Sequence, residues 1–204
     1  MRLRQRYFIQ IRNNMLRNNN NDSKRSTRKF PNGDAIRTRR TYFDVHSGQL
    51  HVRTAFPATG GFDEQPPLIC VHASGESSRV FGQFLPAIAA LRSVYAPDLP
   101  GSGESDPPPA GAAAAGAGAL RDLARDLRLR EVDLITVGDG AAIAADLLAV
   151  APALVRRLVL LDPPGTERFH GIAQPLLVIG PMAAAGERVP PALAQRVAEF
   201  LDRR

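Results

Sequence analysis

Strand-length segments without a polar face place the strongest constraint on how this chain can fold. In Leu68-Ile69-Cys70-Val71 every side chain is apolar, and the runs Leu158 to Leu161 and Leu176 to Ile179 repeat the pattern. Successive side chains of a strand point to opposite faces, so these strands must be covered on both sides. Such coverage is typical of a parallel sheet that lies between two layers of helices.

Strand-like and helical patterns alternate along the chain. Apolar residues recur at helical spacing after Ser77 or Ser78, either of which can cap a helix that runs to about Arg92. The polarity of residues 42–54 alternates around Ser47-Gly48, which predicts a hairpin at a sheet edge. Further strands are expected at 94–97, 132–136, 155–161 and 176–179, and further helices around 120–127, at 141–150 and at 190–204. The sequence therefore predicts an α/β fold, a three-layer sandwich with a mostly parallel, doubly wound sheet.

The distribution of charge divides the chain into two parts. Residues 1–40 hold twelve Lys or Arg and two Asp, a balance of +10, whereas residues 41–204 hold fourteen Arg and eighteen acids, a balance of −4. We expect residues 1–40 to be a disordered basic tail and residues 41–204 to be one domain. The tail could be a nucleic-acid or membrane-surface arm or a targeting peptide. A solvated extension is favoured, so no specific nucleic-acid partner is expected.

Cys70 is the single cysteine, which excludes an internal disulfide and favours a cytoplasmic location. No apolar stretch reaches the ~18 residues that a membrane-spanning helix needs, so no span is predicted.

Residues that directly follow the strands are the candidates for function, because ligands of doubly wound sheets bind at the carboxyl ends of strands. His72-Ala73-Ser74-Gly75 follows the first buried strand, and Asp98-Leu99-Pro100-Gly101-Ser102-Gly103-Glu104-Ser105 follows the second. These segments resemble the α/β-hydrolase family, namely its His-Gly loop and its Asp-x-x-Gly-x-Gly-x-Ser turn. Residues 156–163 and 172–180 are similar to later strands of the family. The resemblance covers roughly residues 41–180 and implies an α/β-hydrolase-like fold without a lid domain. It also implies that His72, Ala73 and Ser74 form the loop that supplies an oxyanion-hole amide.

The family's nucleophile lies in Gly-x-Ser-x-Gly, at a tight turn from strand to helix. Without gaps, this motif aligns with Thr136-Val137-Gly138-Asp139-Gly140, which places Gly138 at the serine position. Glycine adopts the strained backbone of such a turn at low cost, so Gly138 keeps the turn and removes the attacking oxygen.

Three alternatives would give the chain a function despite the missing serine. A register shift by one residue makes Asp139 the nucleophile, as in haloalkane dehalogenases, although this chain has no Trp for a halide clamp. A serine elsewhere could attack, although turn and capping roles are favoured for Ser74, Ser77, Ser102 and Ser105. Gly138-Asp139-Gly140 could cradle a phosphate at the helix start, but the third small residue of that fingerprint is missing and Asp139 would repel an anion.

The acid and the base of a triad also lack their usual residues. Pro181-Met182-Ala183 follows the last strand where an acid is expected, and Glu187 is the nearest carboxylate. Asp162 is a possible substitute, because some relatives in the family take the acid from the end of the earlier strand at 155–161. A turn-capping role is favoured for Asp162. No histidine occurs beyond His170, which makes that residue the remaining candidate base, whereas His72 is expected to be structural. The short segment after Gly180 suggests that part of the family's usual carboxyl end has been deleted.

Loss of the nucleophile or the base of a serine triad lowers turnover by roughly six orders of magnitude. The resemblance implies a hydrolase of small ester-like or acyl substrates, and the residues predict a degenerate site with weak activity. The alternative is a non-catalytic module that binds a small ligand or a partner in the same cleft. Neither function is expected to need a metal or another cofactor.

Overall fold

A single mixed sheet organises the structure, a computed structural model that describes residues 36, 38–58, 65–108, 110, 115–180 and 189–203. Within these residues the sheet has seven strands in the order β1-β2-β4-β3-β5-β6-β7. They are β1 (Arg39–Val45), β2 (Gly48–Ala55), β3 (Leu68–Val71), β4 (Val94–Pro97), β5 (Val132–Val137), β6 (Val155–Leu161) and β7 (Leu176–Ile179). β1 and β2 pair antiparallel, as do β2 and β4, and the remaining neighbours are parallel. The predicted α/β fold with a mostly parallel sheet is therefore confirmed.

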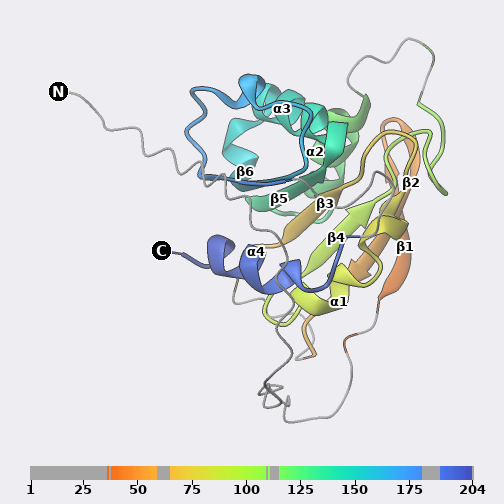
Figure 1. The fold of residues 1–204 in the computed structure, drawn as a ribbon. Coiled ribbons are helices and arrows are strands. Elements are labelled where there is room, and N and C mark those ends of the chain that lie inside the picture. Colours follow the sequence, from red (N-terminus) through yellow and green to blue (C-terminus); the bar gives the residue numbers. More distant parts are fainter. Residues whose placement is uncertain are drawn as a thin grey trace.

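Helices cover both faces of the sheet (Figure 1). α2 (Ala115–Asp126) and α3 (Ala141–Val150) pack on one face, and α1 (Phe84–Ile88) and α4 (Leu193–Leu201) pack on the other. β3 shows why its sequence has no polar face: Leu68 and Cys70 enter the core under α1 and α4, whereas Ile69 and Val71 enter the core under α2.

The predicted edge hairpin is present as β1 and β2. Its turn ends at Gly48, whose φ of 118° lies in a region that side-chain-bearing residues rarely adopt. The predicted tail, residues 1–40, lies outside the described residues apart from Ile36 and residues 38–40, and β1 begins within it at Arg39.

The prediction of one continuous helix up to Arg92 was wrong. The chain instead forms a 3-10 turn, η1 (Ser78–Phe81), and the short helix α1, which ends at Ile88. Ser77 caps the turn as expected, since its Oγ accepts the N–H of Arg79 at 3.4 Å. Pro86 explains the break, because it has no N–H to donate to the carbonyl of Gly82.

A buried ion network occupies the amino ends of the parallel strands. Asp133, the second residue of β5, has no exposed surface, and its Oδ2 accepts a hydrogen bond from Arg92 at 2.9 Å. Its Oδ1 accepts another from Arg156 Nε at 2.9 Å. Arg92 also pairs with Asp202, and Arg156 donates to the Leu201 carbonyl at 2.8 Å, so the network fastens the end of α4 to the sheet. Burial raises the pKa of Asp133, and the two guanidinium groups oppose that shift.

None of the described helices combines the length and the apolar character that crossing a membrane requires.

Candidate functional site

The carboxyl ends of β3, β5, β6 and β7 lie next to one another and form the carboxyl edge of the sheet. In the strand register Val71 of β3 pairs with Thr136 of β5, Val137 pairs with Leu161 of β6, and Leu161 pairs with Ile179 of β7. The segments that follow these ends therefore leave the sheet side by side, as the doubly wound topology predicts. They begin at His72, Gly138, Asp162 and Gly180.

The turn between β5 and α3 has its strained residue at Gly138. Val137 is extended, with φ −115° and ψ 135°, whereas Gly138 has a φ of 53°. The three-residue turn η2 (Gly138–Gly140) then leads into α3. Asp139 does not share the left-handed backbone, so Gly138 forms the apex of the turn. A Cβ built on Gly138 would meet the Ala73 Cβ at 3.3 Å, which places the apex against the loop after β3.

Gly140 allows the same two segments to pack closely, because it has no side chain. A Cβ at this position would lie 2.6 Å from the His72 carbonyl oxygen, closer than real Cβ contacts come. Gly140 is therefore required by close backbone approach rather than by an unusual φ.

Asp139 links the turn between β5 and α3, referred to below as the elbow, to the loop after β3. Its Oδ1 accepts the backbone N–H of Ser74 at 2.8 Å, although the side chain itself is exposed. That backbone hydrogen bond lowers the pKa of Asp139, and the Ser74 side chain contributes in the same direction. The carboxylate is therefore ionised at neutral pH.

His72 is fully buried and both of its ring nitrogens are engaged. Nδ1 lies 2.8 Å from the Ala73 carbonyl oxygen, and Nε2 accepts the N–H of Leu99 at 2.9 Å. A carbonyl only accepts, so Nδ1 must donate, which fixes the neutral tautomer that carries its proton on Nδ1. His72 joins the loop after β3 to the turn after β4 and has no nitrogen left for a substrate.

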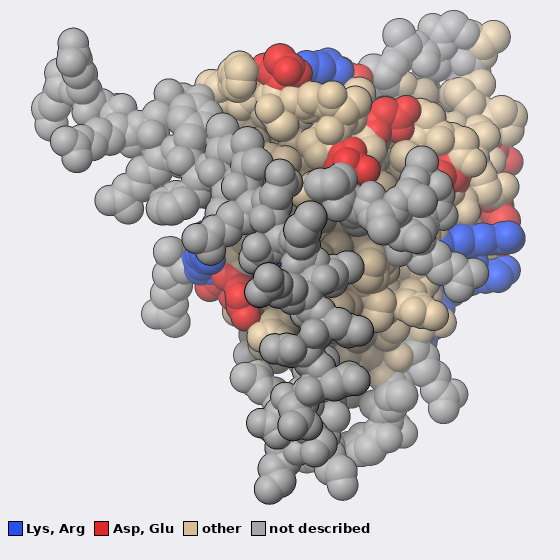
Figure 2. All heavy atoms as spheres, in the orientation of Figure 1, with Lys and Arg blue, Asp and Glu red and all other residues tan. Residues whose placement is uncertain are grey.

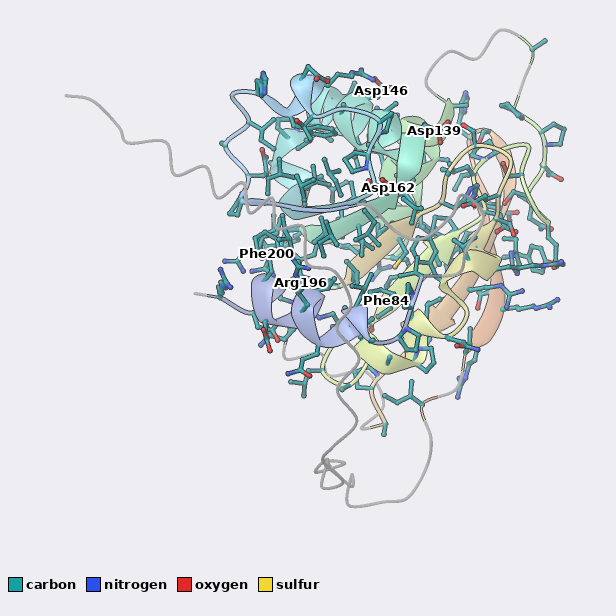
Figure 3. The ribbon with its side chains drawn as sticks, viewed as in Figure 1. Phe84, Asp139, Asp146, Asp162, Arg196 and Phe200 are labelled. Carbon is teal, nitrogen blue, oxygen red and sulfur yellow. The ribbon has the colours of Figure 1, made fainter. Side chains whose placement is uncertain are left out.

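Asp162 and His170, the candidate acid and base, both lie in the segment between β6 and β7. Asp162 directly follows β6, is exposed, and adopts a φ of 48°, an uncommon value for a residue other than glycine. Its N–H donates to the Ile179 carbonyl at 2.7 Å, which ties it to β7. Figure 3 labels Asp139 at the start of α3 and Asp162 at the end of β6. His170 is exposed after the turn η4 (Glu167–Phe169), and no hydrogen bond or ion pair of the described residues joins it to either carboxylate.

The sequence motif at 98–105 forms a buried hydrogen-bond network that includes a histidine which no pattern had indicated. Asp98 accepts the N–H of Ser78 at 2.6 Å and the N–H of Glu104 at 2.9 Å, and it lies 2.9 Å from His51 Nδ1. Burial acts to raise the pKa of Asp98, but these hydrogen bonds outweigh it and lower the pKa. The sequence signal for this network was Asp98 followed five residues later by Gly103. The structure shows why glycine is needed there, because a Cβ on Gly103 would lie 2.0 Å from Asp98 Oδ2.

The serines weighed as alternative nucleophiles have structural contacts. The Ser105 Oγ donates to the Asp98 carbonyl at 2.7 Å and accepts the N–H of His51 at 2.9 Å. Ser77 caps η1, and Ser74 gives its N–H to Asp139. The hydroxyl contacts of Ser77 and Ser105 agree with the capping and turn roles expected for them, whereas the Ser74 contact is made by its backbone N–H. Glu187 and residues 181–183 lie outside the described residues.

A groove of about 530 Å³ lies away from this edge, between the end of α1 and α4. Its lining includes Leu91, Arg92 and Gln195 and none of the residues that follow the parallel strands. The groove is therefore separate from the candidate site.

The elbow, the loop after β3 and the sheet order together define a domain of the α/β-hydrolase type. The chain belongs to the alpha/beta hydrolase family, whose model matches residues 68–204.

Curated relatives are mycobacterial. The uncharacterized protein Rv2715 of Mycobacterium tuberculosis is 32% identical over 141 residues, which are 68% of this chain and 40% of that protein. The uncharacterized protein Mb2734 of Mycobacterium bovis matches to the same extent. The chain thus spans about two-fifths of the length of the curated relatives that it matches.

Solved structures share the fold. Naproxen esterase (carboxylesterase NP) from Bacillus subtilis superposes with a TM-score of 0.56 at 23% identity, over 63% of this chain and 44% of that one. The DbeA-M1 loop variant of a haloalkane dehalogenase from Bradyrhizobium elkanii gives a TM-score of 0.55 at 24% identity, over 62% of this chain and 40% of that one. At this level of identity the likeness concerns the fold alone.

Proposed function

We propose that this chain is a degenerate member of its family, which takes a small ester-like or acyl ligand at the carboxyl edge of the sheet and hydrolyses it weakly. The observation that carries the proposal is Gly138, the left-handed residue at the apex of the elbow. In the family the nucleophile sits on this strand-to-helix turn. With glycine there, the apex offers no side-chain oxygen to attack a carbonyl.

The neighbouring groups support weak rather than efficient hydrolysis. Efficient covalent catalysis needs a nucleophile and a base within hydrogen-bond reach of each other. His72 is committed to Ala73 and Leu99, and His51 is buried against Asp98. Binding together with an oxyanion hole can still accelerate hydrolysis by about three to four orders of magnitude over water.

The test is hydrolysis of p-nitrophenyl acetate and butyrate by wild type and by Asp139→Ala. Asp146→Ala is a matched control, because Asp146 lies on α3 and pairs with Arg168 at the surface. We expect a low rate in wild type that survives in both variants. Fast turnover that disappears in Asp139→Ala alone would identify Asp139 as the nucleophile and overturn the proposal.

A second candidate is a non-catalytic module that binds a small ligand or a partner on the same fold. The hydrogen bond from Ser74 to Asp139 favours it, because the amide that would polarise a substrate carbonyl is already engaged. Wild-type rates equal to those of buffer would support this candidate over the weak hydrolase.

A further inference from the structure

The Ser74 amide is held by a carboxylate from a distant part of the chain. Asp139 lies 65 positions after Ser74, and its Oδ1 accepts the Ser74 N–H at 2.8 Å. The approach of Gly140 to His72 keeps the two segments in place, since any larger residue at 140 would force them apart. The contact is therefore set by backbone packing and not only by a flexible side chain.

In the family, the amide that corresponds to Ser74 N–H binds the oxyanion of the substrate rather than a side chain of the protein. An oxyanion hole combines an N–H from the loop after β3 with the N–H of the residue after the nucleophile. By resemblance these would be the N–H groups of Ser74 and Asp139. Here the carboxylate of Asp139 takes the first of these donors, and a hydrogen bond to an ionised acceptor is stronger than one to a neutral carbonyl.

We propose that Asp139 is a specificity-determining residue, a built-in anion that occupies the Ser74 amide and excludes ligands with a negative charge at the carboxyl edge of the sheet. The inference rests on the proposed binding of a ligand at this edge. A carboxylate ligand would have to displace Asp139 and then lie next to its charge. An uncharged ester or amide faces no such repulsion.

The surroundings of the contact support exclusion of anions. The hydrogen bond from Ser74 lowers the pKa of Asp139, which keeps the group charged down to acidic pH. Asp162 adds a second exposed carboxylate after the adjacent strand. Figure 2 shows acidic side chains, in red, over the part of the surface where Figure 3 labels these two residues in the same orientation.

The rival explanation is that Asp139 only stabilises the conformation of the loop after β3. Asparagine separates the two roles, because Asp139→Asn keeps the Oδ1 acceptor and removes the charge. A purely structural role would be rescued by Asn, whereas exclusion of anions would not.

The experiment follows the Ser74 amide by ¹⁵N–¹H NMR in the full chain while sodium acetate is added at constant ionic strength. Wild type should show no saturable shift. Asp139→Ala should bind acetate at least roughly tenfold more tightly, since it loses a unit charge at contact distance and frees the donor. Asp139→Asn should lie between them, and Asp146→Asn should behave as wild type.

An acid titration keeps the test decisive if Asp139→Ala disturbs the loop. In wild type the Ser74 amide shift should follow a single titration below pH 3.8, and this titration should be absent in Asp139→Asn. Equal acetate affinity in wild type and Asp139→Asn, or the same acid titration in both, overturns the inference. Neither readout depends on ester turnover, so this inference and the proposed function can fail separately.

Discussion

The two ends of β5 carry aspartates with opposite environments. Asp133 at the amino end is fully buried and shares its oxygens with the guanidinium groups of Arg92 and Arg156. Asp139, just past the carboxyl end, is exposed and accepts one backbone N–H. One strand therefore has an end that secures the fold and an end that presents polar groups to solvent. Mutations at the two ends should separate stability from ligand recognition.

The largest effect is expected from Asp133→Ala. Removing the carboxylate leaves the guanidinium of Arg92, a residue only 1% exposed, with the partly exposed Asp202 as its remaining ion-pair partner. Breaking a buried ion pair by removing one partner costs about 3–5 kcal/mol. Urea unfolding followed by circular dichroism should show a loss of this size.

Asp146→Ala is the matched control for that measurement, since its ion pair with Arg168 is exposed and should contribute at most about 1 kcal/mol. Equal losses in the two variants would mean that the amino end of β5 has no special role in stability.

Gly140→Ala should produce the next largest effect. The new Cβ would meet the His72 carbonyl at 2.6 Å, so the elbow and the loop after β3 must separate. Overpacking of this kind costs about 1–3 kcal/mol. Unfolding should report the loss, and the Ser74 amide resonance should move because its contact with Asp139 is strained.

Gly118→Ala in α2 serves as the control, because a Cβ there meets nothing within 4 Å. Alanine in place of a helical glycine should stabilise the protein by about 0.4–1 kcal/mol. A neutral result at position 140 would contradict the close approach of the two segments.

The strands, their order of appearance and the position of the elbow were predictable because each leaves a local pattern. Apolar runs identify buried strands, and the glycines around Asp139 identify a turn into a helix. The network at Asp133 was not predicted, because its members come from β5, from the segment before β4, from β6 and from the end of α4. A charged residue inside an apolar strand was the one signal in the sequence.

Candidate residues could be named from the sequence one by one, but their contacts could not. Sequence spacing brought Ser74 and Asp139 to the same sheet edge, yet it could not show that one accepts a hydrogen bond from the other. Nor did spacing indicate that His51 would be buried against Asp98, because the strands of a hairpin alternate polar and apolar residues whether or not a polar side chain has a partner.

Gly138→Ser tests the proposal that the turn from β5 to α3 has neither a nucleophile nor a base to activate one. A residue with a Cβ at this φ costs about 1–2 kcal/mol, and the Ala73 methyl group must yield slightly. We expect no gain in p-nitrophenyl ester hydrolysis and no rapid labelling by a fluorophosphonate probe, since His72 has no free nitrogen. Gly138→Ala carries the same strain without the hydroxyl, and labelling of the serine variant alone would reveal a base at this edge.

The smallest expected effect is the pH dependence of the contribution that Asp139 makes to the free energy of unfolding. Hydrogen bonding lowers the pKa of Asp139 in the folded state, so its contribution to stability is present above the unfolded value of 3.8 and is lost as the pH falls through the folded value. The difference in unfolding free energy between wild type and Asp139→Asn should therefore be constant near neutral pH and should shrink below about pH 3.8. Taking the difference cancels the titration of Asp98, whose pKa is also lowered but whose contacts both proteins share. A difference that stays constant down to pH 2 would show that the charge of Asp139 contributes nothing to its contact with Ser74, and the two ends of β5 would then differ in burial alone.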